Sequence, residues 1–293
     1  MRLLYCLVAL LLSSGAVGQT TYRMADSLTI CQMLKSAPSD AGTLYFARCL
    51  MGRPYVAHTL EVNDDERLVV NTRQLDCTTL VETVAALTLC AQSEKRSWND
   101  YTDMLTRLRY RQGTIDGYAS RLHYFSDWIA DKERMGLVGE LQQPNPPFSA
   151  VQTVNVNYMS RHPHAYKALK ANPALVKTIR RQEQHLSGTK ASYIPKKSLR
   201  DNDHLLRQTI QDGDIIAITT SKPGLDIAHL GFAFWMDDGL HLLNASQLHK
   251  KVVVEPMTFY QYMLKHPTFT GIRVVRLKNL KSRNTEKYKT SDI

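Results

Sequence analysis

The chain has 293 residues, with 37 Lys and Arg against 27 Asp and Glu, which gives a formal net charge of +10. Beyond the N-terminal segment it contains no run of roughly 18 apolar residues, the minimum for a membrane span, so we expect no transmembrane helix. No linker rich in Pro, Gly or Ser and no internal repeat divides the chain, so we expect one compact, monomeric unit.

The first 18 residues have the composition of a secretory signal peptide. Arg2 is followed by an apolar run at 3–12 and by the small residues "SSGAVG" up to Gly18. A basic start, an apolar core and small residues before the cut are typical of such segments. We therefore expect residues 1–18 to be removed and residues 19–293 to act in the periplasm or outside the cell.

The excess of basic residues indicates the kind of partner an exported protein would meet. A cationic protein is attracted to anionic envelope polymers or headgroups. Nucleic acid is not an expected partner in that compartment. A solvated basic C-terminal tail accounts for much of the same charge and needs no partner at all.

The first half of the chain has mainly helical periodicity. Residues 24–36 and 40–51 predict two helices, and Ser39 or Asp40 is the expected cap of the second. Residues 68–70 predict a short extended stretch.

A longer helix is expected after Asp76, its N-cap, and should end near residue 92. Because its residues are apolar on most sides, the helix is expected to be buried. Residues 98–200 are expected to form a helical insertion, with one helix beginning within "HYFSDWIADKERM".

From residue 214 the pattern changes to short runs rich in β-forming residues. These runs are "DIIAITT", "HLGFAFWM", "LHLLNAS", "KVVVE" and "GIRVVRL", with a helix expected near 257–265. Helices first and strands afterwards favour an α+β domain with a largely antiparallel sheet.

Four cysteines follow the expected signal peptide: Cys31, Cys49, Cys77 and Cys90. Their spacings match no zinc signature, and we expect neither a metal nor another cofactor. Cys31 and Cys49 could form a disulfide between the first two helices.

Cys77 and Cys90 occupy opposite ends of the expected buried helix. At a helix N-terminus, unpaired amide hydrogens and the helix dipole lower the pKa of a thiol. Cys77 therefore has the position of a nucleophile, whereas Cys90 lies in the last turn, where the field favours the thiol. On position alone, a small buried structural cysteine is the commoner case.

A nucleophilic cysteine needs a base, and His229 is the best placed because it opens a predicted strand. If Asp238 and Gly239 form a two-residue turn, His229 and Asn244 lie four residues apart along the hairpin. A four-residue loop at 235–238 would instead set them directly opposite each other. Both registers put the two side chains on one face, and we favour the longer loop because it completes a Cys, His, Asn arrangement.

Five segments occur in the order "GRPYVAHTLE", "LDCTTLVE", "QDGDIIAIT", "GLDIAHLGFAF" and "HLLNAS". In this order they resemble the NlpC-type papain-fold cysteine peptidases and amidases of bacterial cell walls. The nearest resemblance is to the N-acetylmuramoyl-L-alanine amidase-like branch, and it covers most of the chain. It implies a papain-like α+β fold.

The resemblance also implies how the site residues act. Cys77 would be the nucleophile, His229 the general base and then acid, and Asn244 the group that orients the imidazole. Tyr55 would help to polarise the scissile carbonyl, and Asp76 matches the aspartate before the cysteine and is expected to contact substrate. Asn244 stands where this branch usually has histidine.

The implied substrate is peptidoglycan or a muropeptide, cut between the N-acetylmuramoyl lactyl group and L-alanine. Three alternatives remain open: an endopeptidase that cuts within the stem peptide, a module that binds muropeptides without cutting them, and an acyltransferase that uses the same thiol.

Several side chains between residues 98 and 200 could contact the substrate. Stem peptides carry carboxylates, which Arg109, Arg121 or Arg161 could bind by paired hydrogen bonds. Aromatic residues could form the walls of a cleft, namely Tyr110, Tyr124, Trp128 and Tyr158. An ordinary surface arginine or a core aromatic residue is the competing interpretation for each.

Overall fold

The computed structural model describes residues 20–38, 40–200 and 204–280, so the expected signal peptide and Ser39 lie outside the described residues. The described α-helices are α1 (Met24–Ser36), α2 (Thr43–Cys49), α3 (Cys77–Gln92), α4 (Trp98–Arg109), α5 (Phe125–Arg134), α6 (Tyr158–Arg161), α7 (Lys167–Ala171), α8 (Pro173–Leu186), α9 (His204–Thr209) and α10 (Phe259–Leu264). The short 3-10 turns are η1 (Arg111–Gly113), η2 (Tyr118–Ser120), η3 (Pro163–Ala165) and η4 (Lys196–Ser198).

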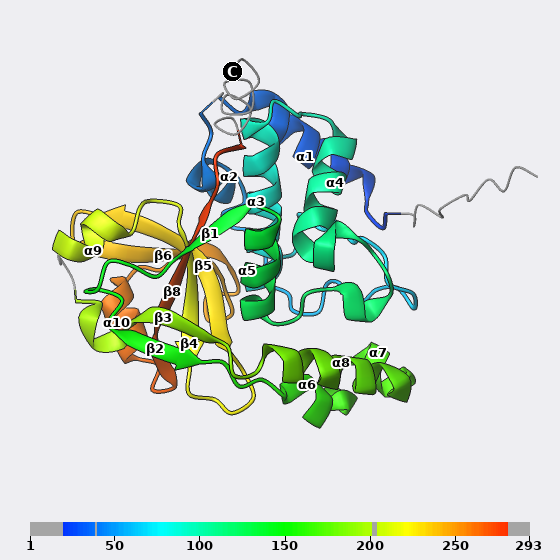
Figure 1. Cartoon of the computed structure of the whole chain (residues 1–293). Helices are drawn as coiled ribbons and strands as arrows, with labels where there is room; N and C mark the ends of the chain where they lie inside the picture. Colours follow the sequence, from blue (N-terminus) through cyan, green and yellow to red (C-terminus); the bar gives the residue numbers. More distant parts are fainter. Residues whose placement is uncertain (1–19, 39, 201–203, 281–293) are drawn as a thin grey trace, which may run out of the picture.

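The strands are β1 (Val138–Leu141), β2 (Ala150–Thr153), β3 (Lys190–Pro195), β4 (Ile215–Thr220), β5 (Ile227–Met236), β6 (Gly239–Ser246), β7 (Lys251–Val254) and β8 (Phe269–Leu277). They form an open sheet in the order β2-β3-β8-β4-β5-β6-β7, with β1 also paired to β8. Each strand pair is antiparallel. The predicted α+β class with an antiparallel sheet is confirmed (Figure 1).

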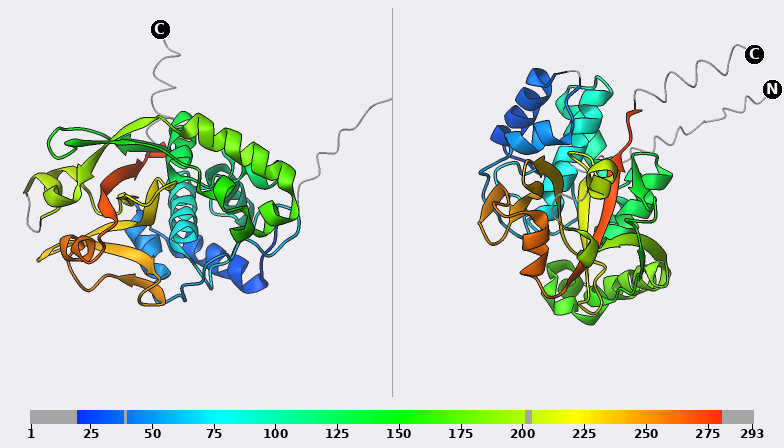
Figure 2. Two further views of the ribbon diagram at one scale, coloured as in Figure 1. Left: turned by 90° about the horizontal axis from the view of Figure 1, so that it is seen from below. Right: turned by 90° about the vertical axis from the view of Figure 1, so that its left-hand side faces the viewer.

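Both faces of the sheet are covered. Alternate residues of β4 point to opposite faces, so Ile215 and Ala217 join a core with α3, whereas Ile216 and Ile218 join a core with α10. Figures 1 and 2 show α3 beside the sheet among α1, α2, α4 and α5, with α6, α7 and α8 at one end of the molecule. The site described below lies near the start of α3.

Helix α3 follows the sequence prediction closely. Its N-cap is Asp76, whose side chain accepts a hydrogen bond from the Thr79 amide at 2.8 Å. Every residue from 79 to 91 is buried, because the helix is apolar on most sides and is surrounded by the sheet and its neighbouring helices. A capped, rigid helix fixes the position of Cys77 at its first residue.

Helix α2 begins later than predicted. Its N-cap is Gly42 and not Asp40, and the first helical residue is Thr43. The buried Thr43 hydroxyl donates to the Gly213 carbonyl oxygen at 2.7 Å, which ties the start of α2 to the loop before β4. This contact across 170 residues has no local sequence signal.

The stretch 98–200 is not the purely helical insertion that we expected. Besides α4 to α8 it contributes β1, β2 and β3, which pair into the same sheet as the C-terminal strands. Strands β1 and β2 have four residues each, and their hydrogen bonds come from β8 and β3. Short strands of this kind depend on partners distant in sequence, so their own residues carry little signal.

The four described cysteines are free thiols, so the disulfide that Cys31 and Cys49 could have formed is not present among them. None of the described helices is long and apolar enough to cross a membrane.

Candidate active site

The start of α3 lies beside a second segment that brings Tyr55 to it. Tyr55 and Leu75 form a parallel β-bridge, and the Tyr55 amide donates to the Lys250 carbonyl oxygen at 2.9 Å. The segment therefore lies between the beginning of β7 and the residues that lead into α3. This places the half-buried Tyr55 near Cys77.

Cys77 and His229 line one cavity, with a volume of about 210 Å³. The remaining lining residues are Thr78, His123, Tyr124, Phe125, Met159, Tyr166, Leu225, Asp226, Ile227, Ala228 and Leu230. The backbone of Leu230, the residue after His229, also hydrogen-bonds the sulfur of Cys77. The fold thus brings together a thiol and an imidazole that are 152 positions apart in the sequence.

The β5–β6 hairpin has neither of the two registers considered from the sequence. Met236 pairs with Gly239, so the turn consists of Asp237 and Asp238 alone, and the expected four-residue loop is wrong. Gly239 has a φ of 143°, which glycine adopts readily, and the Asp238 carboxylate lies 2.9 Å from His241. Both residues therefore stabilise the tight turn between β5 and β6.

The observed register sets His229 and Asn244 diagonally across the hairpin. Phe232 pairs with Leu243, so Asn244 lies opposite Gly231, two residues along from His229. His229 Nε2 is nevertheless 2.9 Å from Asn244 Oδ1, because diagonal neighbours on one face are within reach of long side chains. The predicted shared face is confirmed.

The contacts of Asn244 define the proton positions on His229. Asn244 is fully buried, and its Nδ2 donates to Glu255 Oε1 at 2.9 Å. Its Oδ1 must then accept a hydrogen bond, so His229 carries its proton on Nε2. In the neutral imidazole Nδ1 is left as the proton acceptor.

Burial favours the neutral form of both members of the thiol–imidazole pair. Burial and then the charge of Asp76 raise the pKa of Cys77 to about 12, although hydrogen bonds from Leu230 and Thr78 lower it. The hydrogen bonds from Thr78 at the helix start act in the predicted direction, but burial outweighs them. Burial lowers the pKa of His229, which keeps the imidazole unprotonated at neutral pH.

Tyr55 and Asp76 complete the surroundings of the thiol. Burial, and next the negative charge that Cys77 and Asp76 can carry, raise the pKa of Tyr55, so its hydroxyl stays protonated and can donate. Asp76 uses Oδ1 to accept from the backbone and hydroxyl of Thr79. Its capping function is thus occupied by the helix, and contact with substrate stays a prediction.

Two of the expected substrate-binding side chains are instead buried in the core. Arg109 is 2% exposed, and its guanidinium donates to Glu82 at 2.7 Å and to the Val69 carbonyl oxygen at 2.6 Å. Tyr110 is also buried, and its hydroxyl donates to Glu66. The expectation that they contact substrate is wrong, because both side chains already have buried partners.

Tyr158 and Arg161 lie on α6 but do not line the cavity with Cys77. The Tyr158 ring stacks on His162, with centroids 4.3 Å apart, and Arg161 is exposed. The residue between them that reaches the cavity is Met159. Helix α6 therefore borders the cavity through a different side chain from those predicted.

The three further candidates for substrate contact also differ in position: one lines the cavity with Cys77 and two do not. Tyr124 lines the cavity, and its hydroxyl donates to the buried Glu183 at 2.7 Å. Trp128 is buried, and its ring stacks on Phe125. Arg121 is 6% exposed and forms ion pairs with Glu61 and Glu66, so it holds a loop rather than facing the cavity.

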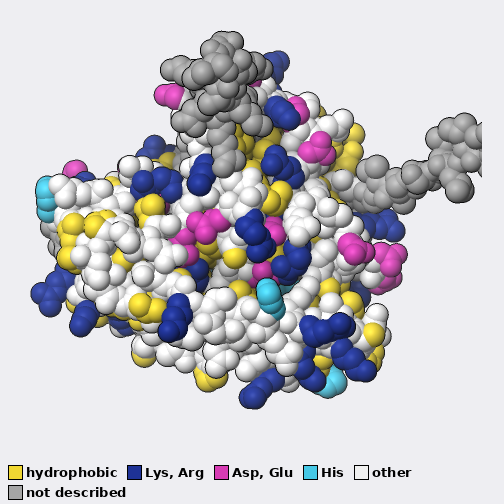
Figure 3. All heavy atoms as spheres, viewed as in Figure 1, with side chains coloured by type: hydrophobic (Ala, Val, Ile, Leu, Met, Phe, Trp, Pro, Cys, Tyr) yellow, Lys and Arg dark blue, Asp and Glu magenta, His cyan; other side chains and the backbone are white. Residues whose placement is uncertain are grey.

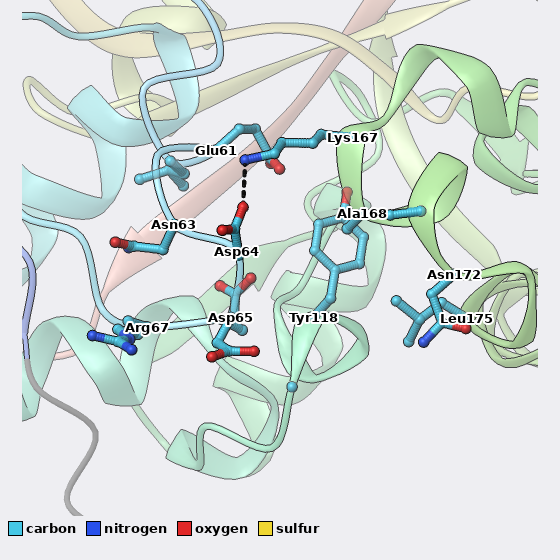
Figure 4. Close-up of a pocket in the computed structure, with 14 residues that line it drawn as sticks. Glu61, Asn63, Asp64, Asp65, Arg67, Tyr118, Lys167, Ala168, Asn172 and Leu175 are labelled. Carbon is cyan, nitrogen blue, oxygen red and sulfur yellow. Dashed lines mark hydrogen bonds and ion pairs between the residues drawn. The ribbon is translucent and has the colours of Figure 1, made fainter.

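A second cavity, of about 470 Å³, lies between the loop at 60–67, Tyr118 and the helices α7 and α8 (Figure 4). Its rim carries an ion pair between Lys167 and Asp64, with Nζ and Oδ1 2.9 Å apart. The Tyr118 ring packs at a tilt of 35° against His123, which lines the first cavity, with ring centroids 4.6 Å apart. Each cavity is thus lined by one ring of this pair.

The surface around α7 and α8 is basic. Figure 3 shows dark blue side chains over this end of the molecule. The basic residues of the two helices include Lys167, Lys170, Lys177, Arg180 and Arg181. The described residues contain no group of three or more His, Cys, Asp or Glu side chains that could hold a metal ion.

Several residues of the site were not identified from the sequence, namely Glu255, Met159, Tyr166 and Asp226. Only Glu255 has a recognisable signal, since it is an acidic residue that ends the apolar run "KVVVE". The others approach Cys77 only through the tertiary fold.

Comparison with known proteins supplies a family for this site. A family model described as AmiA-like, N-acetylmuramoyl-L-alanine amidase-like, matches residues 45–272. No protein with a curated description matches the chain.

Solved structures agree with the family model. An N-acetylmuramoyl-L-alanine amidase from Bacteroides uniformis is 43% identical, with a TM-score of 0.76, over 84% of this chain and 99% of its own. A Bacteroides fragilis protein described as a candidate xylanase is 42% identical, with a TM-score of 0.74, over 78% and 98%. A Legionella pneumophila protein at 22% identity, with a TM-score of 0.64 over 86% and 94%, shares the fold. With the family model matching well over half of its length, the chain belongs to the AmiA-like, N-acetylmuramoyl-L-alanine amidase-like family of peptidoglycan hydrolases.

Proposed function

We propose that this protein is an exported cysteine amidase with a papain-like fold, which hydrolyses the bond between the N-acetylmuramoyl lactyl group and L-alanine. The observation that carries the proposal is the cavity shared by Cys77 and His229, with His229 hydrogen-bonded to Asn244 at 2.9 Å. The amidase described for Bacteroides uniformis supports the choice of bond.

In the first half of the reaction, Cys77 attacks the lactyl carbonyl carbon. His229 Nδ1 takes the thiol proton as the sulfur–carbon bond forms, because the thiol is not ionised in advance. The carbonyl oxygen becomes an oxyanion, which the Tyr55 hydroxyl and backbone amides at the start of α3 can stabilise. The carbon–nitrogen bond then breaks, and His229 returns the proton to the amino group of L-alanine.

The second half regenerates the thiol. Water loses a proton to His229 and attacks the thioester, and the carbon–sulfur bond breaks as Cys77 recovers its proton. The products are a muramoyl carboxylate and a stem peptide with a free amino end. Neither half consumes an oxidant or a cofactor.

The description of the Bacteroides fragilis relative raises glycoside hydrolysis as an alternative. Most glycosidases use two carboxyl groups on either side of the scissile bond. Among the residues that line the cavity with Cys77, Asp226 is the one carboxylate, and it accepts from the Ser126 and Ile227 amides at 2.7 and 2.9 Å. This composition favours the amidase.

The test is mass spectrometry of a defined disaccharide-tripeptide and its anhydro form after incubation with the purified protein. Free sugar plus intact tripeptide, formed by the wild type and not by Cys77→Ala, is the expected result. The ratio between the two substrates measures whether the end group is recognised.

Other products would contradict the proposal. Fragments of the peptide would identify an endopeptidase, and xylan or sugar-chain cleavage would identify a glycosidase. Retained substrate with measurable binding would identify a binding module.

Export needs its own experiment, since residues 1–18 lie outside the described part of the chain. We expect the protein recovered from its native host to begin at Gln19, measured by intact mass. Recovery of a chain that still begins at Met1 would contradict export by this segment.

A further inference from the structure

Beyond Asn244, a second buried group extends the hydrogen-bond chain from His229. Glu255 follows β7 and is fully buried. Its Oε1 accepts from Asn244 Nδ2 at 2.9 Å, and its Oε2 lies 3.0 Å from Nε2 of His249. The side chain of His249 is 31% exposed, so the chain runs from the cavity to the surface.

The hydrogen bond between Asn244 and Glu255 decides which end of the Asn244 amide faces His229. The oxygen and the NH2 group of an asparagine side chain have nearly the same shape, so packing alone does not choose between them. A carboxylate only accepts hydrogen bonds, so Glu255 selects the NH2 group and leaves Oδ1 for His229. The Leu242 carbonyl oxygen, 3.4 Å from the same Nδ2, supports this orientation.

We propose that Glu255 is a positioning residue of the hydrolysis: it orients Asn244 so that His229 keeps its proton on Nε2 and presents Nδ1 to Cys77. This inference rests on the proposed cysteine mechanism. A Glu255 with only a structural function would hold β6 and β7 together and would affect stability alone.

The charge of Glu255 also acts on His229. Asp76 before α3, Glu255 after β7 and His266 after α10 interact electrostatically with the imidazole. The other titratable groups that line its cavity are Cys77, His123, Tyr124, Tyr166 and Asp226. Burial lowers the pKa of His229, whereas the Asn244 hydrogen bond and the negative charge of Glu255 raise it. Loss of that charge therefore lowers the pKa of His229 further, and the acid limb of kcat/KM moves to lower pH.

Two variants separate orientation from charge. Glu255→Gln keeps an oxygen that can accept from Asn244 but removes the charge. It should retain the Nε2–H tautomer and shift the acid limb. Glu255→Ala removes both, so the tautomers should mix and kcat/KM should fall roughly tenfold or more, as for other groups that orient a reacting side chain.

The direct readout is the 15N NMR spectrum of the histidine side chains in the full-length protein, with His229 assigned by comparison with His229→Gln. Glu82→Gln is the matched control, because Glu82 is equally buried but is paired with Arg109. This control should change neither the tautomer nor the acid limb. A single Nε2–H tautomer in Glu255→Ala, or an unmoved acid limb in Glu255→Gln, would overturn the proposal.

A double-substitution cycle tests whether Glu255 acts through Asn244. Asn244→Ala should lower kcat/KM without abolishing it, and adding Glu255→Ala should cause little further loss. An equal loss in both backgrounds would overturn the proposal. A wild type that cleaves no muropeptide would contradict the amidase activity, while the nitrogen spectrum would still decide whether Glu255 orients Asn244. If Glu255→Ala does not fold, Glu255→Leu, which keeps the volume of the side chain but accepts no hydrogen bond, replaces it in the nitrogen spectrum.

Discussion

The two ends of α3 carry the same kind of residue in different surroundings. Cys77 opens the helix, is half-buried and shares a cavity with His229. Cys90 is fully buried in the core, and its thiol donates to the Asp100 carbonyl oxygen at 3.4 Å. Burial raises the pKa of both thiols to about 12. Access to a cavity and a neighbouring base therefore distinguish Cys77, and thiol acidity does not.

At Cys77 burial outweighs the acidifying effect of the helix start. The rise from 9.0 to about 12 corresponds to about 4 kcal/mol. A helix terminus supplies at most about 2 kcal/mol in favourable geometry. The negative charge of Asp76 acts in the same direction as burial. A proton acceptor at the thiol is therefore required, and His229 is the candidate.

The sharpest test of the comparison is to replace each thiol in turn. Cys77→Ala should lower turnover of a disaccharide-tripeptide by at least roughly a thousandfold, because no other nucleophile is available in the proposed mechanism. Its unfolding midpoint should stay near that of the wild type, since Cys77 is only half-buried. Full activity in Cys77→Ala would refute the mechanism.

Alkylation of the thiols measures the dependence on His229. The wild type should react with iodoacetamide at Cys77 once the pH exceeds the pKa of His229, which burial holds below its usual value of 6.5. In His229→Ala the thiol must ionise unaided, so the rate should rise about tenfold per pH unit towards about 12. Peptide mapping should find Cys90 unmodified in both proteins, and equal pH profiles would show that His229 is not the acceptor.

Cys90→Ala should have the reverse effects of Cys77→Ala. Removal of a fully buried sulfur leaves a small cavity and should cost about 1–2 kcal/mol of unfolding free energy. The kcat value should remain near that of the wild type. Chemical denaturation monitored by circular dichroism, with kcat measured in the same preparation, checks both. A strong loss of kcat in the folded variant would place Cys90 in the reaction.

The smallest expected effect concerns the cap that positions Cys77. Asp76→Ala removes the oxygen that accepts from the Thr79 amide and should cost about 1 kcal/mol of unfolding free energy. Asp76→Asn retains a good cap and should cost less. Because Asp76→Asn also removes a negative charge, it should lower the pKa of Cys77. Equal stability losses in the two variants would contradict the capping function.

Local patterns in the sequence were enough to predict much of the secondary structure and the fold class. The cap at Asp76 and the apolar residues after it are contiguous, so the start and burial of α3 could be predicted. The shared face of His229 and Asn244 was also predictable, since side chains on strands alternate with a period of two. The antiparallel α+β class follows from the order of helices and strands.

Residue types alone could not determine which side chains reach the cavity. The guanidinium of Arg109 is a typical carboxylate-binding group, but in the core it donates its hydrogen bonds to Glu82 and to the Val69 carbonyl oxygen. Met159 has no polar signal, yet it lines the cavity with Cys77.

The sequence by itself therefore determined the secondary structure around Cys77, its position at a helix start and the face that His229 and Asn244 share. Only the tertiary structure decided the hairpin register, the contact of Glu255 with Asn244 and the pairing of Arg109. The physical reason is the range of the interactions. Capping and periodicity act within a few residues, whereas burial, ion pairing and hydrogen-bond direction depend on partners that the folded chain brings from elsewhere.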